Sequence, residues 1–340
     1  MISHSHRKFR SARARTRWLT FVCCALVAFI ATPSLRAQDD DDDGVIRPTG
    51  VHKRPASQSA TPKRATTKSK KRKSSAIAEA TPAPTPFPLP ASPSDRNRVP
   101  ETRAVSVMVV DARTGEILYQ KNADQPRPAA STQKLLTSLV LLDTGFLDHQ
   151  VTVEPTDTFA EPVRLNIKPG ETYQRIDLLR ALLVKSPNDV ARCLARDNAG
   201  SVEAFALKMN AKARALGATH SYFLNPNGLP IPGQYSTARD LAIIARAAYS
   251  NATIRSIVSQ PQLIFRYANG RTRLLQNTNK VLTRLPYCNG MKTGYTEAAG
   301  HCLIASGSRS GRDVIVVVLG DTKAGVWSDA ASLLSWGLWL

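Results

Sequence analysis

Three short polar strings stand in order along this chain: Ser131-Thr132-Gln133-Lys134, Ser186-Pro187-Asn188 and Lys292-Thr293-Gly294. A serine hydroxyl is a weak nucleophile at its ordinary pKa, so it needs a neighbouring base. On a helix, a lysine three residues after the serine lies on the same face and within reach of the hydroxyl. The first string therefore predicts a nucleophile, Ser131, and its base, Lys134, and the three strings together predict an acyl-transfer site.

The order of the strings is more informative than any one of them. A chain of 340 residues contains about one S-x-x-K string by chance, whereas Lys-Thr-Gly is rarer. Taken singly, the lysines could be solvated surface residues, Ser186-Pro187-Asn188 a helix cap and Gly294 a bulge residue. Their occurrence together and in this order favours the catalytic interpretation.

The residues around the first string predict that Ser131 lies at the N-terminus of a helix. Pro126 and Pro128 precede the serine, and apolar residues follow it at helical spacing, at positions 135, 136, 139 and 140. Backbone N–H groups and the helix dipole favour negative charge at that end, as an oxyanion hole requires.

The other elements predict an α+β fold. A hairpin is expected over 104–120, because turn residues separate two extended runs. Helices are expected over 177–184, 189–196, 202–216 and from about 236, with the Ser186-Pro187-Asn188 string on a loop between the first two. Strands are expected over 263–267, 288–294, 302–306 and 314–319, and a last helix over 328–336. Strands near both ends of the folded part predict a single sheet.

The N-terminus predicts export. Residues 1–17 are basic and contain no acid, residues 18–30 are almost wholly apolar, and Leu35-Arg36-Ala37 offers a cleavage point. The apolar run is short for a membrane span, so we expect residues 1–37 to be a signal peptide cleaved after Ala37. The protein is then expected in the periplasm or cell envelope. An uncleaved signal would instead tether it to the membrane.

Residues 38–101 are predicted to be a disordered linker, because they lack a periodic apolar pattern and are rich in Pro, Ser, Thr and Ala. Charges come in blocks, acidic over 39–43 and basic over 68–73, before a stiff spacer over 81–86. Of the net charge of +20, +11 lies in residues 1–101 and +9 in the rest. We expect the basic linker to contact an anionic envelope surface non-specifically, and we expect no nucleic-acid partner.

The cysteines and histidines of the folded part do not predict a metal site. After signal cleavage three cysteines remain, and each lies near apolar residues: Cys193, Cys288 and Cys302. We interpret them as buried small hydrophobic residues. The histidines are far apart in sequence: His149, His220 and His301. No metal or organic cofactor is expected.

From about Arg103 to Leu338 the chain resembles the D-alanyl-D-alanine carboxypeptidases of the low-molecular-weight penicillin-binding class. The resemblance includes the three strings and the stretches over 225–229, 236–241 and 290–296. It implies a β-lactamase/transpeptidase-like fold over 102–340, in which an antiparallel sheet flanked by helices joins an all-helical subdomain. The active site would lie between the two parts.

The resemblance also implies a reaction, the release of the terminal D-alanine from peptidoglycan stem peptides through an acyl-enzyme. Ser131 would attack the carbonyl of the penultimate D-alanine, Lys134 would take the serine proton, and Ser186 would relay a proton to the leaving amine. Lys134 can act as a base only if burial or a nearby cation, such as Lys292, depresses its pKa. β-Lactam antibiotics would be covalent inhibitors.

Substrate binding is implied for residues of the second and third strings. Asn188 would orient the substrate amide, and Lys292 and Thr293 would bind the terminal carboxylate. Gly294 and Tyr295 complete this stretch, and the backbone N–H groups of Ser131 and Tyr295 would hold the oxyanion. Many relatives have an arginine where this chain has Gly325-Val326-Trp327, which removes one expected carboxylate contact.

Three other functions remain open at this stage. A DD-endopeptidase cuts peptidoglycan crosslinks by the same acyl chemistry, and the sequence barely separates it from a carboxypeptidase. A β-lactamase is less favoured, because no convincing Glu-x-x-Leu-Asn string is present to position a deacylating water. A non-catalytic wall-binding protein is disfavoured by the intact serine and lysines.

Overall fold

The computed structural model describes residue 87 and residues 98–340. The predicted signal peptide, 1–37, and nearly all of the predicted linker, 38–101, lie outside the described residues. Within the described part, no helix combines the length and the apolar character needed to cross a membrane.

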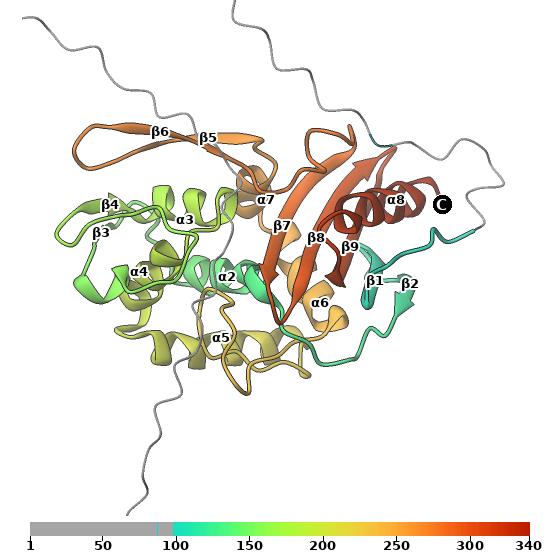
Figure 1. Cartoon of the computed structure of the whole chain (residues 1–340), viewed down its shortest axis with the longest axis horizontal. Coiled ribbons are helices and arrows are strands. Elements are labelled where there is room, and N and C mark those ends of the chain that lie inside the picture. Colours follow the sequence, from blue (N-terminus) through green and yellow to red (C-terminus); the bar gives the residue numbers. More distant parts are fainter. Residues whose placement is uncertain (1–86, 88–97) are drawn as a thin grey trace, which may run out of the picture. The chain divides into compact units, whose positions relative to one another are not determined.

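A five-stranded sheet has the strand order β2-β1-β9-β8-β7, and all neighbouring strands in it are antiparallel (Figure 1). Its strands are β1 (Ser106–Asp111), β2 (Ile117–Lys121), β7 (Cys288–Thr296), β8 (Gly300–Arg309) and β9 (Arg312–Asp321). The early hairpin therefore joins the last three strands in one sheet, as the sequence predicted.

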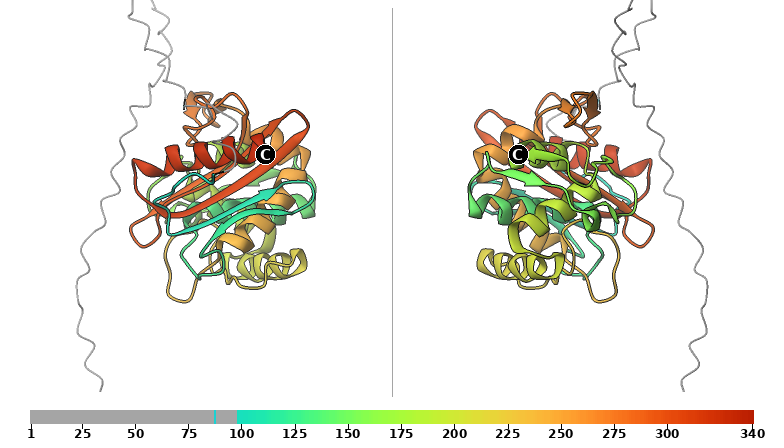
Figure 2. Two further views of the ribbon diagram at one scale, coloured as in Figure 1. Left: turned by 90° about the vertical axis from the view of Figure 1, so that its right-hand side faces the viewer. Right: turned by 90° about the vertical axis from the view of Figure 1, so that its left-hand side faces the viewer.

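Both faces of the sheet are covered, which explains the long apolar run in β9. Val314, Val316 and Val318 belong to the apolar cluster that includes residues of the last helix, α8 (Gly325–Trp339). The alternate residues, Ile315, Val317 and Leu319, belong to the larger cluster of the helical region. Figure 2 shows α8 on one side of the sheet and the other helices on the opposite side. A strand buried on both faces is expected to read as a continuous apolar run.

The helical region is built around α2 (Lys134–Thr144), whose first eight residues are all buried. It contacts α3, α4, α5 and α6. The surrounding helices are α3 (Arg175–Val184), α4 (Asn188–Ala199), α5 (Val202–Leu216), α6 (Ala238–Ser250) and α7 (Ala252–Val258). The α+β fold, with an antiparallel sheet next to a helical region, is confirmed.

Two boundaries near the strings differ from the prediction. Ser131 does not begin an α-helix but lies in a 3-10 turn, η1 (Ala130–Gln133), directly before α2. Ala130 has a φ of 47°, a left-handed conformation that regular helix does not allow, so the α-helix starts only at Lys134. Asn188 is the first residue of α4 rather than a loop residue, while Ser186 and Pro187 form the connection from α3.

The strand expected over 263–267 is present but is not part of the main sheet. It is β5 (Gln262–Arg266), which pairs with β6 (Thr272–Gln276) in a separate two-stranded hairpin. The Phe265 ring of this hairpin packs at a tilt against Tyr173, with centroids 5.4 Å apart, and edge-to-face against Tyr267 at 5.2 Å. A second short pair, β3 (Gln150–Thr152) and β4 (Thr172–Gln174), and a 3-10 turn, η2 (Pro155–Thr158), were not predicted.

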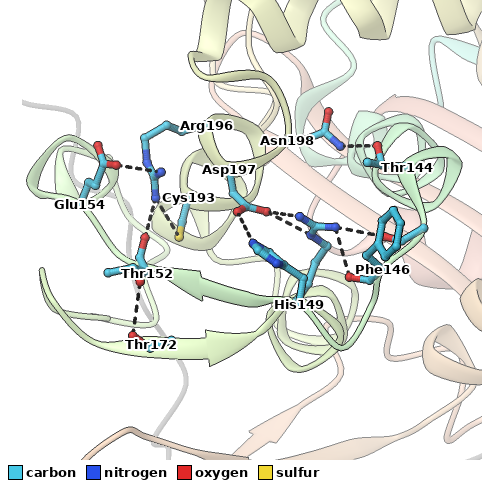
Figure 3. Close-up of polar contacts among 12 residues, drawn as sticks. Thr144, Phe146, His149, Thr152, Glu154, Thr172, Cys193, Arg196, Asp197 and Asn198 are labelled. Atoms are coloured by element: carbon cyan, nitrogen blue, oxygen red, sulfur yellow. Dashed lines mark hydrogen bonds and ion pairs between the residues drawn. The ribbon is translucent and has the colours of Figure 1, made fainter.

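Ion pairs fix the C-terminal half of α4 (Figure 3). Asp197 lies 2.7 Å from Arg175 of α3, and His149 Nε2 lies 3.4 Å from the same carboxylate. Arg196 lies 2.9 Å from Asp157 of η2. These contacts hold the helix whose first residue, Asn188, belongs to the second string.

The three cysteines of the folded part are unpaired and buried, as predicted. Burial raises the pKa of Cys288 and of Cys302 to about 11, and burial likewise raises the pKa of Cys193. A thiol with a raised pKa and no access to solvent is a poor nucleophile.

Candidate active site

Ser131 and Lys134 form a hydrogen-bonded pair. The Lys134 Nζ lies 2.9 Å from the Ser131 Oγ. The tight turn of η1 places Ser131 next to Lys134, the first residue of α2. The three-residue spacing therefore produces the contact between hydroxyl and amine that the sequence predicted. The serine hydroxyl also donates to the carbonyl of Asn227, at 3.2 Å.

The second string surrounds the same amine. Lys134 Nζ donates to the Ser186 carbonyl at 2.9 Å and to the Asn188 Oδ1 at 2.8 Å, and it lies 3.1 Å from the Ser186 Oγ. Ser186 has a φ of 69°, unusual for a residue other than glycine. This left-handed turn brings the residue's carbonyl and its hydroxyl to one amine. Strain of this kind is common at functional sites.

Asn188 holds the amine and a loop at the same time. Its Nδ2 donates to the carbonyls of Glu161 and Pro162, at 3.0 and 2.9 Å, and its backbone N–H donates to Val163 at 2.7 Å. The Oδ1 accepts from Lys134. The side-chain amide is therefore fully engaged in this structure.

The pKa of Lys134 is well below its ordinary value. Burial is the main cause, because the side chain has no exposed surface, and the nearby Lys292 ammonium lowers the pKa further. The carboxylate of Asp189 acts in the opposite direction. A neutral amine keeps a lone pair, which can accept the proton of the serine hydroxyl.

Lys292 comes from β7, the strand at one edge of the five-stranded sheet. Burial alone lowers its pKa to about 7. Its Nζ donates to the carbonyl of Thr293 at 3.1 Å, which leaves N–H donors for a further acceptor. The Thr293 hydroxyl is itself oriented, because it donates to the Thr278 Oγ1 at 2.7 Å.

Two glycines allow the backbone to approach the nucleophile closely. A Cβ on Gly294 would lie 2.8 Å from the Ser131 nitrogen and 3.0 Å from the Thr132 nitrogen, so β7 packs directly against η1. A Cβ on Gly228, which has a φ of 85°, would overlap the Ala130 carbonyl. Larger residues at either position would push these segments away from the turn that carries Ser131.

The loop over 225–229, one of the stretches of the resemblance, packs against the turn that carries the nucleophile. Gln133 Nε2 donates to the Asn225 carbonyl at 2.6 Å, and the Thr137 hydroxyl donates to the Pro226 carbonyl at 2.7 Å. The contact between Ser131 and Asn227 was not predicted. It joins residues 96 apart in sequence, which no local pattern indicates.

The structure thus brings Ser131, Lys134, Ser186 and Asn188 together by direct hydrogen bonds, and it places Lys292 and Gly294 beside them. Tyr295 differs from these residues. Tyr295 is 55% exposed, and its ring stacks on His301 with a centroid distance of 4.4 Å.

Sequence reasoning missed two polar residues, Thr278 and Asp189. Thr278 orients Thr293 from outside the strand, and no spacing pattern connects the two. Asp189 directly follows the second string and is 1% exposed. An aspartate in the first turn of a helix is a common stabilising residue, so its position alone did not suggest a role in the site.

An antiparallel sheet beside a helical region, with a serine and two buried lysines between them, is the arrangement of the serine acyl enzymes that bind penicillin. Comparison with known proteins agrees with this class. A family model described as D-alanyl-D-alanine carboxypeptidase matches residues 94–323. The chain belongs to this family of serine hydrolases.

Individual relatives extend over most of the folded part. The chain is 38% identical over 245 residues to D-alanyl-D-alanine carboxypeptidase DacB2 of Mycobacterium tuberculosis, covering 70% of this chain and 84% of the relative. It is 33% identical over 242 residues to D-alanyl-D-alanine endopeptidase of Escherichia coli, covering 70% and 78%. The crystal structure of a D-alanyl-D-alanine carboxypeptidase from M. tuberculosis superposes with a TM-score of 0.68 at 37% identity, covering 72% and 94%.

Proposed function

We propose that this protein is a serine-type D-Ala-D-Ala carboxypeptidase that removes the terminal D-alanine from peptidoglycan stem peptides. The observation that carries the proposal is the buried amine of Lys134, whose pKa is depressed, 2.9 Å from the Ser131 hydroxyl. A neutral amine in that position is a general base for a hydroxyl nucleophile.

In the proposed acylation, the Ser131 Oγ attacks the carbonyl carbon of the penultimate D-alanine while Lys134 takes the hydroxyl proton. The backbone N–H groups of Ser131 and Tyr295 stabilise the oxyanion. The peptide C–N bond then breaks, Ser186 relays a proton from Lys134 to the leaving amine, and D-alanine departs. Water attacks the resulting ester, which frees the shortened peptide and restores the serine.

Lys292 and Thr293 are the proposed binding residues for the terminal carboxylate of the substrate. The Lys292 amine has N–H donors left after its bond to the Thr293 carbonyl. The Thr293 hydroxyl would donate to the carboxylate once it accepts, rather than donates, in its contact with Thr278. Binding an anion would also restore the charged form of this lysine. Asn188 is proposed to position the Lys134 amine, because its amide group is already bonded to the 161–162 carbonyls.

A DD-endopeptidase is the second candidate, and the similarity to the E. coli endopeptidase favours keeping it. The two functions share acyl chemistry and differ in the substrate beyond the scissile bond. Release of free D-alanine from a soluble pentapeptide, measured against cleavage of purified crosslinked dimers, decides between them. Faster cleavage of the dimers would overturn the carboxypeptidase proposal.

Covalent labelling by fluorescent penicillin tests the nucleophile itself. We expect one label per molecule in the wild-type protein and none in Ser131→Ala. Many turnovers of a chromogenic β-lactam would instead indicate a β-lactamase, and absence of labelling would indicate a non-catalytic wall-binding protein. Undiminished labelling of Ser131→Ala would overturn the assignment of the serine.

We further propose an exported protein with a signal peptide over 1–37, a charged linker over 38–101 and the catalytic domain over 102–340. The basic linker would hold the enzyme near anionic envelope polymers, and salt would weaken that attraction. Sedimentation with cell walls at low salt compares the mature chain with a version that begins at residue 101. Equal sedimentation of the two would contradict the proposal.

A further inference from the structure

Asp189 is a buried carboxylate beside the proposed base, and the reaction described above does not use it. It is 1% exposed and follows Asn188 in the first turn of α4. Its oxygens accept from the backbone N–H groups of Leu165 and Asn166 at 2.9 and 2.7 Å, and from Val190 at 2.9 Å. Burial raises the pKa of the Asp189 carboxyl, but both oxygens face N–H donors, which favour the carboxylate over the carboxylic acid.

Asn188 and Asp189 both bond to the same segment of the chain, residues 161–167. Asn188 bonds to the backbone of Glu161, Pro162 and Val163, and Asp189 bonds to the backbone of Leu165, Asn166 and Ile167. The two neighbouring side chains therefore fix one continuous stretch, 161–167, against the start of α4. Asn188 in turn accepts from the Lys134 amine at 2.8 Å.

We propose that Asp189 is a positioning residue of the reaction, which fixes Asn188 and the 161–167 segment and so keeps the Lys134 amine aligned with Ser131. The inference rests on the proposed function, because it assigns Asp189 a role through the proposed base. The inference also concerns the negative charge of Asp189, which acts on the Lys134 amine. Around Lys134 the described structure places the neutral groups of Ser131, Ser186 and Asn188, the cation of Lys292 and the anion of Asp189.

A packing role alone and the proposed positioning role of Asp189 predict opposite shifts in the pH dependence of acylation. The carboxylate of Asp189 raises the pKa of Lys134 and so opposes part of the lowering by burial and by Lys292. Replacing the Asp189 carboxylate by a neutral amide of the same shape should lower the pKa of Lys134 further. The acid limb, which is the low-pH side of the plot of acylation rate against pH, should then move to lower pH. A loosened site that admits water would lessen the effect of burial and move the limb to higher pH.

The test measures the rate constant of acylation by a fluorescent penicillin against pH in Asp189→Asn. We expect a rate about 10-fold to 100-fold lower, since the new amide donor faces backbone donors and shifts the segment that positions Asn188, without admitting water to Lys134. We also expect the acid limb at lower pH than in the wild-type protein. An unchanged rate, an unmoved limb or a limb at higher pH would each overturn the inference.

Asp240→Asn is the matched control. Asp240 is also 1% exposed and also lies in the first turn of a helix, α6, where it accepts from the His220 N–H at 2.7 Å and the Ser221 hydroxyl at 2.6 Å. It is not among the charged groups that act on Lys134. We expect its acid limb to coincide with that of the wild-type protein. An equal shift in both variants would contradict a specific role for Asp189.

A second variant covers the case in which Asp189→Asn does not fold. The Tyr267 hydroxyl donates to the Leu165 carbonyl at 2.9 Å, so Tyr267→Phe loosens the same segment without changing a charge. We expect acylation a few-fold slower with the acid limb in place, and an unchanged rate would then overturn the inference. If the wild-type protein is not labelled, the proposed function fails. If it is labelled and these variants behave as wild type, only the role of Asp189 fails.

Discussion

The two ends of α4 are both polar, but they differ in how their charged groups are paired. At the C-terminal end, the buried Arg175 lies 2.7 Å from Asp197 and the partly buried Arg196 lies 2.9 Å from Asp157, so each cation faces an anion. At the N-terminal end, Lys134 and Lys292 are two buried amines, and the direct partners of Lys134 are neutral oxygens.

The difference shows how one helix can serve both stability and chemistry. Opposite charges at hydrogen-bond distance keep each other ionised, and breaking such a buried pair is strongly destabilising. A buried amine without a carboxylate in contact loses its proton more easily, which costs stability but yields a base. The C-terminal end of α4 thus fixes the helix, while the N-terminal end uses that fixed position for the reactive group.

The largest expected effect comes from removing the base at the N-terminal end. Lys134→Ala should slow acylation by fluorescent penicillin by roughly 10²-fold to 10⁴-fold, the usual contribution of a general base. Lys212→Ala is the control, because Lys212 pairs with Asp143 at the surface, 2.8 Å away. Acylation of Lys134→Ala within threefold of the wild-type rate would refute the role of Lys134.

Breaking an ion pair at the C-terminal end should act on stability instead. Asp197→Asn leaves the Arg175 guanidinium, whose side chain is 6% exposed, without its carboxylate. We expect the free energy of unfolding in urea to fall by about 3 kcal/mol, with the acylation rate of the folded molecules retained. Asp143→Asn, at an exposed pair, should cost about 0–1 kcal/mol. Equal losses in the two variants would remove the contrast between buried and exposed pairs.

Lys292→Met should have a smaller effect on stability and one of opposite sign, a gain rather than a loss. The variant should bind the substrate carboxylate poorly but unfold at a higher temperature. Burial lowers the pKa of Lys292 to about 7 in the folded protein, against an ordinary value of 10.5. Between these values the unfolded chain binds more protons, so wild-type stability rises with pH. The destabilisation by Lys292 is therefore complete below about pH 7 and fades toward pH 10.5.

Thermal unfolding of Lys292→Met at several pH values checks this sign. We expect a gain of about 1 kcal/mol or more at pH 6 to 7, with little gain near pH 10. Lys168→Met, at an exposed lysine, should show no such dependence. A loss of stability in Lys292→Met at pH 7 would show that the buried amine supports the fold.

Much of this arrangement could be predicted from local sequence. The three-residue spacing of Ser131 and Lys134 predicted their contact. The apolar runs of β1 and β9 predicted that these strands belong to one sheet. The start of α2 was misplaced, because the left-handed φ of Ala130 depends on the packing of η1 against Gly228 and Gly294. Such packing joins residues about 100 or more positions apart.

The polar residues that support the site were missed for the same reason. Asp189 bonds to backbone groups 23 and 24 residues earlier in the chain, and Thr278 bonds to a strand residue 15 positions later. The strand predicted over 263–267 was likewise assigned to the main sheet, and its partner β6 was not predicted, because periodicity identifies a strand but not its partner. Reactive side chains can be recognised by type and spacing, whereas the groups that orient them require the fold.

The central claim is that burial, together with the nearby Lys292 amine, holds the pKa of Lys134 well below its usual range. An NMR titration of the lysine side chains, with resonances assigned through Lys134→Ala and Lys292→Met, measures both directly. We predict that Lys134 loses its proton well below pH 10.5 and that Lys292 titrates near pH 7 in the free protein. Titration of both amines near pH 10.5, as for solvated lysines, would contradict the account.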